Sequence, residues 1–208
     1  MESTMQSTAG NSYEKWFSHL GGGLCSTNLQ YLICGDTSEV RILILILSQF
    51  VAMKILMVCL GNICRSPVAE GVLRQRLKES GITNIHVDSA GTSGWHNGEH
   101  PDKRSTLNAK QNGVDISKQI SRKFSASDFE NFDIIYVMDQ SNYIDVTAMT
   151  SDQHHLSKVR LLLNEIKPDS NAAVPDPYYG GEDGFQRVFE LIDQACRIIV
   201  TRISENKL

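Results

Sequence analysis

The sequence has no surplus of basic residues. Lysine and arginine together number 20, against 24 aspartates and glutamates, so the formal net charge of the 208-residue chain is -4. A broadly basic face for binding nucleic acid is therefore excluded, although a local basic pocket is compatible with this charge. We expect no nucleic-acid partner.

Cysteine is scarce, and its count is odd. Five cysteines in a chain of this length do not form the paired framework that holds small secreted domains together. Free thiols in a reducing compartment are the better interpretation, and the sequence therefore predicts a cytoplasmic protein.

A membrane-spanning run is also missing. The longest aliphatic run is Ile42–Leu47, whereas a helix that crosses a bilayer needs about 20 apolar residues. Arg41 precedes the run, and Ser48 and Gln49 follow it. The run also lies too far into the chain for a signal peptide. We expect no membrane span.

The chain divides near Met53. Residues 1–52 show no clear periodicity, and we interpret them as an extension that is non-native or loosely ordered. The alternative is an added strand or a membrane-proximal segment. Residues 53–208 form the predicted domain, and the 41% of hydrophobic residues in the whole chain is typical of a globular protein.

Strands and helices alternate from Lys54 onward. This order predicts an α/β fold in which a doubly wound, four-stranded parallel sheet has helices on both faces. The predicted strands are 55–58, 85–87, 132–138 and 159–163. The predicted helices are 67–80, 101–112, a short helix after Ser127, a helix capped by Asp139 or Ser141, and 185–203, with an irregular loop over 167–184.

The residues with the clearest chemistry follow the first predicted strand. Cys59 is placed at the carboxyl end of a parallel strand, and five residues separate it from Arg65 at the start of a helix. Residues 60–66, which we call the oxyanion loop, can turn successive N–H groups toward one anion of phosphate size. Gly61 permits a positive φ and Asn62 tolerates one. The loop residues predicted to bind phosphate are Leu60, Gly61, Asn62, Ile63, Cys64, Arg65 and Ser66.

This positive environment favours the thiolate form of Cys59, while the planar fork of Arg65 can hold two anion oxygens. The alternatives are an inert buried cysteine, a solvated arginine, or a metal site that includes Cys59 and Cys64. We find no further Cys or His pair at ligand spacing to complete such a site. We therefore expect neither a metal nor a cofactor.

The segment Val58–Glu70 resembles the signature of the low-molecular-weight protein tyrosine phosphatases. The resemblance extends over residues 53–208 and includes 88–92, 138–142 and 176–179. It implies that Cys59 is the nucleophile, that Arg65 binds phosphate and stabilises the transition state, and that Asp176 is the general acid. It further implies that Asn62, Ser66 and Ser89 support the loop and that Trp95, Tyr178 and Tyr179 wall the entrance.

Asp176 is also notable without the resemblance, because Pro175 and Pro177 stiffen the backbone on both sides of it. A carboxylic acid on a loop above the pocket can protonate the departing oxygen of a phosphate ester. A plain surface turn is the alternative.

Cys64 is a predicted redox residue, since a sulfenic acid on Cys59 can be captured by a second thiol five positions away. The alternative is that Cys64 only packs beneath the loop.

The expected substrate is a phosphotyrosine-containing protein or a small aryl phosphate. Arsenate reduction is an alternative on the same loop, but it needs relay cysteines, and only Cys196 follows Cys64. Relatives that act on phosphoarginine carry threonine at the position of Ile63, so isoleucine favours phosphotyrosine. A noncatalytic phosphate-binding module would be expected to lack Cys59 or Asp176. One departure from the family is Gln119, at a position where many relatives have a histidine that contacts the residue matching Glu70.

Overall fold

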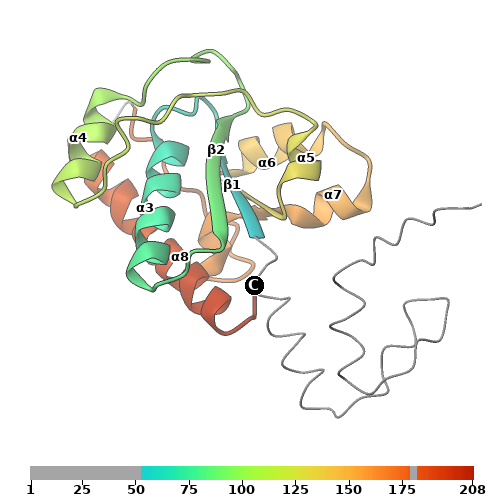
Figure 1. Cartoon of the computed structure of the whole chain (residues 1–208). Coiled ribbons are helices and arrows are strands. Elements are labelled where there is room, and N and C mark those ends of the chain that lie inside the picture. The colour runs from blue at the N-terminus through green and yellow to red at the C-terminus, as the bar shows by residue number, and fades with distance from the viewer. Residues whose placement is uncertain (1–52, 179–181) are drawn as a thin grey trace, which may run out of the picture. The chain divides into compact units, whose positions relative to one another are not determined.

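The computed structural model describes residues 53–178 and 182–208, and in these residues one four-stranded sheet forms the centre (Figure 1). The strands are β1 (Met53–Cys59), β2 (Ile85–Gly91), β3 (Ile134–Val137) and β4 (Val159–Leu161). They are arranged in the order β2-β1-β3-β4, and every pair is parallel. The predicted doubly wound α/β fold is confirmed.

The helices follow the predicted alternation with several differences in their ends. Their bounds are α3 (Arg65–Glu79), α4 (Lys103–Gln111), α5 (Asp128–Asn131), α6 (Gln140–Thr147), α7 (Gln153–Lys158) and α8 (Glu182–Ser204). Helix α3 begins at Arg65, as the loop motif predicted, two residues before the range 67–80 that the apolar spacing gave. Asp139, rather than Ser141, caps α6, because its Oδ1 accepts the backbone N–H of Asn142 at 2.8 Å.

Three local predictions are wrong or incomplete. The last predicted strand is shorter, because Leu162–Glu165 form a 3-10 helix. Helix α7 was not predicted, since it buries no residue and therefore has no apolar stripe. Ser127 precedes α5 as expected, but its side chain does not cap that helix.

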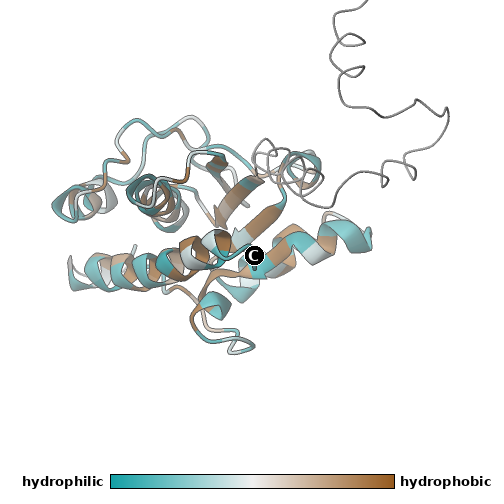
Figure 2. Ribbon diagram, turned by 60° about the horizontal axis from the view of Figure 1, so that its bottom comes forward, coloured by the Kyte–Doolittle hydropathy of each residue, from teal (hydrophilic) through white to brown (hydrophobic). Residues whose placement is uncertain are grey.

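Helices cover both faces of the sheet, as predicted. Ile55, Met57 and Tyr136 pack in one cluster with apolar residues of α3 and α8, whereas Leu56 and Ile135 pack in a second cluster on the other face. Figure 1 shows α3 and α8 on one side of β1 and β2, and α5, α6 and α7 on the other. In Figure 2 the strands carry mainly hydrophobic colours, while α8 alternates between hydrophobic and hydrophilic residues.

The long last helix is held by an apolar stripe along one of its sides. The members of this stripe are each no more than 5% exposed: Phe185, Val188, Phe189, Ile192, Cys196 and Ile199. Burying each such side chain contributes roughly 1.5–3 kcal/mol relative to leaving it in water. The stripe therefore fixes the C-terminal helix against the sheet.

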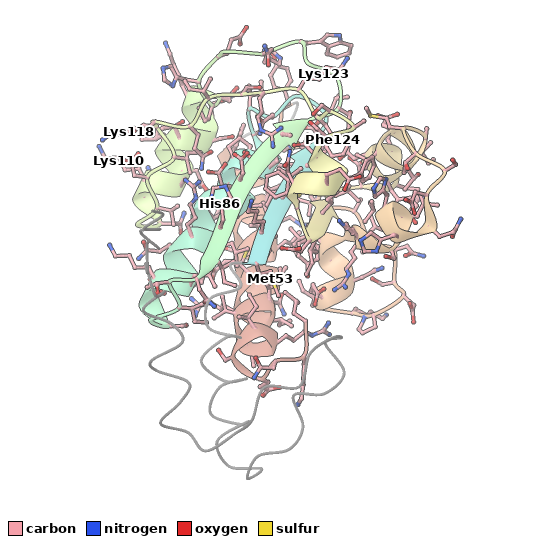
Figure 3. The ribbon with its side chains drawn as sticks, turned by 45° about the vertical axis from the view of Figure 1, so that its right-hand side comes forward. Met53, His86, Lys110, Lys118, Lys123 and Phe124 are labelled. Carbon is pink, nitrogen blue, oxygen red and sulfur yellow. The ribbon has the colours of Figure 1, made fainter. Side chains whose placement is uncertain are left out.

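The carboxyl ends of the strands meet at one edge, which is where the site is expected in an open α/β sheet. Gly91 at the end of β2 forms a bridge with Lys123, and Phe124 N–H donates to the Gly91 carbonyl at 2.8 Å. Figure 3 shows Met53 at one end of the sheet and Lys123 and Phe124 toward the opposite end. Residues 122–124 therefore border the same edge as Cys59.

In residues 53–178 and 182–208, no helix has both the length and the apolar character needed to cross a bilayer. The predictions for residues 1–52 concern a part of the chain that lies outside the described residues.

Candidate active site

The oxyanion loop connects the buried end of β1 directly to α3. Cys64 occupies the N-cap position of α3, and its side chain makes no capping hydrogen bond to the first turn of that helix. The N–H groups of this turn are therefore available to an anion. Asn62 adopts a left-handed conformation, with φ of +54°, whereas Gly61 does not. Of the two residues predicted to permit a positive φ, the asparagine is the one that adopts it.

A cavity of about 240 Å³ opens over this loop. It brings together residues that are far apart in the sequence, among them the candidate site residues Cys59, Arg65, Asp176, Trp95 and Tyr178. The lining consists of Cys59, Leu60, Gly61, Ile63, Cys64, Arg65, Trp95, His96, Asp176 and Tyr178.

The sulfur of Cys59 lies among hydrogen-bonding groups. The Ser66 Oγ atom lies 3.0 Å from Cys59 Sγ, and the backbone N–H of Asn62 donates to the same sulfur at 3.3 Å. Cys59 itself is only 3% exposed. Both groups therefore lie within hydrogen-bonding distance of the sulfur.

The side chain of Asn62 holds the loop from inside. Its Nδ2 donates to Ser66 Oγ and to Ser89 Oγ, both at 2.9 Å, and its Oδ1 accepts the backbone N–H of Arg122 at 2.9 Å. Asn62 is 1% exposed, so these partners replace the water that it loses on burial. The three predicted support residues Asn62, Ser66 and Ser89 thus form one connected network.

Gly91 is a support residue that the sequence analysis missed. A Cβ at this position would lie 2.8 Å from the Leu60 carbonyl oxygen and 3.0 Å from the Asn62 nitrogen, both backbone atoms. These atoms belong to the oxyanion loop itself, so a side chain at Gly91 would displace it. The sequence pointed to this role only through the place of Gly91 within the motif 88–92.

The support network ends at a buried carboxyl group. Ser89 Oγ donates to Glu70 Oε2 at 2.6 Å, and Arg74 pairs with Glu70 Oε1 at 2.9 Å. Burial raises the pKa of Glu70 above its ordinary value, although Ser89 and Arg74 oppose that rise. Gln119 donates instead to the Pro67 carbonyl at 3.1 Å, and its buried Oε1 has no hydrogen-bond partner among the residues that the structure describes. Ser89 and Arg74, rather than Gln119, are the polar partners that hold Glu70.

Arg65 lies at the centre of the charged groups and is 4% exposed. Its Nη1 donates to Asp139 Oδ2 at 2.6 Å and to the Val174 carbonyl at 3.1 Å, and its Nη2 lies 3.4 Å from Asp176 Oδ2. Burial opposes the charge of Arg65, but attraction to Cys59 and the bond to Asp139 outweigh it and raise the pKa of Arg65. Asp139 was predicted only as a helix cap, and the same carboxylate also orients this arginine.

Asp176 and the aromatic wall lie at the mouth of the cavity. The Asp176 side chain is 41% exposed, and its Oδ1 accepts the backbone N–H of Tyr178 at 3.0 Å. Trp95 is 76% exposed and Tyr178 is 44% exposed, and both line the cavity. Tyr179, the third predicted wall residue, lies outside the described residues.

His96 is a further wall residue, and the sequence analysis did not single it out. It lines the cavity, and its Nδ1 lies 2.8 Å from Glu99 Oε2. A Cβ on Gly61 would lie 3.2 Å from His96 Cδ2, so the imidazole packs closely against the oxyanion loop. His96 and Glu99 lie in a polar stretch without periodicity, so the sequence did not indicate that His96 lines the cavity.

Cys64 shares the cavity with Cys59, and it is buried. Burial, together with the nearby Asp102, Cys59 and Asp176, raises the pKa of the Cys64 thiol to about 12. Cys64 is therefore a neutral thiol at neutral pH. In residues 53–178 and 182–208, no three His, Cys, Asp or Glu side chains gather in the way that metal ligands do.

Comparisons with known proteins agree with this geometry. A family model described as low molecular weight phosphotyrosine protein phosphatase matches residues 54–208. The protein of that name from Schizosaccharomyces pombe is 43% identical over 143 residues, which cover 67% of this chain and 90% of the relative.

Solved structures show the same likeness. A protein tyrosine phosphatase from Entamoeba histolytica has a TM-score of 0.70 at 39% identity, covering 75% of this chain and 99% of its own. A Drosophila protein described as an arginine phosphatase has a TM-score of 0.67 at 32% identity, covering 73% of this chain and 98% of its own. With a family match over most of its length and a relative of 43% identity, the chain belongs to the low molecular weight phosphotyrosine protein phosphatase family and is an enzyme of that class.

Proposed function

We propose that the enzyme hydrolyses aryl phosphate monoesters, with phosphotyrosine in proteins as the main substrate, through a phosphocysteine intermediate. The observation that carries this proposal is the arrangement in one cavity of the Cys59 sulfur, Arg65 and the Asp176 carboxyl group. A nucleophile, an oxyanion holder and an acid are the three parts that the reaction requires.

In the first step, the Cys59 thiolate attacks phosphorus, and the bond between phosphorus and the leaving oxygen breaks. The Asp176 carboxylic acid gives its proton to that oxygen. The oxyanion loop and Arg65 hold the equatorial oxygens, so protein groups supply the positive charge that stabilises the transition state. Asp176 lies 3.4 Å from Arg65, and a bound phosphate would take over this arginine contact.

In the second step, water attacks the phosphocysteine and passes a proton to the Asp176 carboxylate. The bond between sulfur and phosphorus breaks, and the electron pair returns to Cys59. Ser66 and the N–H of Asn62 lie at the sulfur and stabilise the departing thiolate. Asn62, Ser66 and Ser89 thus support the loop in this proposal.

Aryl specificity rests on the wall of the cavity. Trp95 and Tyr178 present aromatic surface at the entrance, where they can flank a phenyl ring at small entropic cost. Ile63 lines the same cavity with an apolar side chain, which favours an aryl group over a guanidinium. We place the catalytic domain within residues 53–208. Cys59, Cys64 and Cys196 are free thiols, which supports a reducing compartment such as the cytoplasm.

The test is kinetic and chemical together. Cys59→Ser should abolish turnover of phenyl phosphate while retaining binding of inorganic phosphate, and acid-quenched wild-type enzyme should carry phosphate on Cys59. Activity that survives in Cys59→Ser would overturn the covalent mechanism. Phosphoarginine or arsenate turned over faster than phosphotyrosine would overturn the substrate assignment.

A further inference from the structure

Arg104, on the first turn of α4, lies beside the segment that carries Asp176. Its Nη1 donates to the Tyr178 carbonyl at 3.1 Å. Its guanidinium carbon lies 5.0 Å from the ring centroid of Tyr178 and 4.9 Å from that of Phe185 on α8. A guanidinium at these distances from aromatic faces is attracted by them. Arg104 therefore contacts both a wall residue and the buried Phe185 in the first turn of the last helix.

The orientation of Arg104 is fixed by Asp102. Arg104 Nη2 donates to Asp102 Oδ2 at 2.9 Å, and Nε donates to Asp102 Oδ1 at 3.1 Å. The backbone N–H of Arg104 also donates to Oδ1 at 2.8 Å, so the carboxylate caps the helix and holds the side chain at once. This two-point contact leaves the guanidinium little freedom to turn.

Asp102 is in turn attached to the oxyanion loop. Its backbone N–H donates to the Ile63 carbonyl at 2.8 Å. A continuous set of contacts thus runs from the loop that binds phosphate, through Asp102 and Arg104, to the backbone of Tyr178. Tyr178 N–H bonds the Asp176 carboxylate at 3.0 Å, so the last contact reaches the acid itself.

The segment that carries Asp176 needs such an attachment, because residues 171–177 contain no helix or strand. At its start, Val174 N–H donates to the Met138 carbonyl at 2.8 Å, and Arg65 donates to the Val174 carbonyl. Arg65 is also needed by the phosphate. Arg104 is a second cation that contacts this part of the chain. It binds the carbonyl oxygen of Tyr178, which is two residues after Asp176.

We infer that Arg104 is a positioning residue for proton transfer, which holds Asp176 and Tyr178 at a fixed place relative to the oxyanion loop. This inference rests on the proposed role of Asp176 as general acid. Arg104 does not touch the phosphate or the leaving oxygen in this role. It acts through the backbone and ring of Tyr178.

The test uses a series of aryl phosphates with leaving groups from phenol to 2,4-dinitrophenol. Arg104→Ala should lower kcat/KM for phenyl phosphate about tenfold or more, since small misplacements of a reacting group carry losses of up to a hundredfold. The loss should fall to about twofold or less for dinitrophenyl phosphate, which needs no proton. Competitive inhibition by inorganic phosphate should be unchanged, because Arg65 and the loop remain.

A double variant separates positioning from general support. If Arg104 acts through Asp176, then adding Arg104→Ala to Asp176→Ala should cause no further leaving-group-dependent loss. If the leaving-group-dependent losses of the two single variants instead multiplied in the double variant, the inference would be overturned. Arg104→Lys should restore little, because lysine cannot reproduce the two-point contact with Asp102 or the planar stacking; full activity in this variant would also overturn it.

Arg197→Ala is the matched control, since Arg197 is an exposed arginine of α8 that pairs with Asp193 at 2.9 Å. It should leave the leaving-group series unchanged. Equal losses across the series in Arg104→Ala, with a leaving-group-dependent loss in Asp176→Ala, would overturn the inference alone. An even loss in Asp176→Ala would instead overturn the acid role on which the inference depends.

Discussion

Replacement of Ser66 by alanine should slow the release of phosphate from the enzyme more than the formation of phosphocysteine. Ser66 is fully buried, and its Oγ lies 3.0 Å from Cys59 Sγ. Because Asn62 Nδ2 already donates to this oxygen, the single hydroxyl proton is left for the sulfur or for the Ala90 carbonyl at 3.3 Å. A thiolate is the stronger acceptor, so the proton goes to sulfur when the thiolate forms.

The size of the effect follows from the type of hydrogen bond. A bond to a charged group contributes about 1.5–3 kcal/mol, which corresponds to roughly ten- to a hundredfold in the rate of the step that creates the charge. That step is the departure of the Cys59 thiolate from phosphorus. We therefore expect kcat to fall by about this factor, while kcat/KM, which reports the first step, falls by much less.

Stopped-flow measurements with p-nitrophenyl phosphate test this directly. Ser66→Ala should show a rapid burst of nitrophenol, close to one equivalent per enzyme, followed by slow turnover. Ser121→Ala is the matched control, because its buried hydroxyl donates to the Gly61 carbonyl of the oxyanion loop at 3.2 Å instead of to the sulfur. Equal decreases of kcat and kcat/KM without a burst in Ser66→Ala would refute the reasoning.

Three further results are expected. Peroxide should inactivate the enzyme at Cys59 in a way that dithiothreitol reverses in the wild type but not in Cys64→Ser, and equal recovery in both would contradict a disulfide with Cys64. The raised pKa of Glu70 means that its stabilising contribution is present below the ordinary glutamate pKa, about 4.3, and is lost as pH rises through its folded-state pKa. In urea titrations, the stability of Glu70→Gln should therefore decrease less than that of the wild type as the pH rises above the ordinary glutamate pKa, and parallel pH profiles for the two proteins would contradict this. A chain that begins at Met53 should keep kcat/KM for an aryl phosphate within about threefold, a change of less than about 1 kcal/mol, whereas a large loss in a folded chain would place residues 1–52 in the functional domain.

The sequence was sufficient for the parts of the site that are contiguous. Cys59 and the oxyanion loop, which includes Arg65, lie within eight successive residues, and the strand before them and the helix after them have clear apolar patterns. The order of strands and helices was predictable for the same reason. Residue Ser89 shows the limit, because it and Asp88 interrupt the apolar pattern of β2, and the strand continues to Gly91, beyond the predicted end at 87. Ser89 is buried because Asn62 and Glu70 satisfy its hydroxyl, and this pairing is not visible in a local pattern.

The contacts that orient the charged groups were not predictable, because they join distant positions. Asp139 and Arg65 are 74 residues apart, and so are Arg104 and Tyr178. In each pair, one member had a sufficient local explanation: Asp139 caps α6, and Arg104 is on the exposed first turn of α4. When a local role already explains a residue, the sequence gives no sign of a second role. The second roles of Asp139 and Arg104 therefore became visible only in the folded structure.

Arg65 and Arg104 both contact the segment around Asp176, but they differ in how their contacts can be interpreted. Arg65 is 4% exposed beneath the cavity, where attraction to Cys59 and the bond to Asp139 keep it charged. Its place in the sequence follows from the loop motif, whereas the orientation of its side chain depends on the distant Asp139. Arg104 is half exposed at the rim, where an isolated ion pair contributes little to stability. Its pairing with Asp102 therefore has little value as a stabilising contact. The pairing becomes informative because its other contacts, to Tyr178 and Phe185, fall on the segment that presents Asp176 and on the helix that follows it.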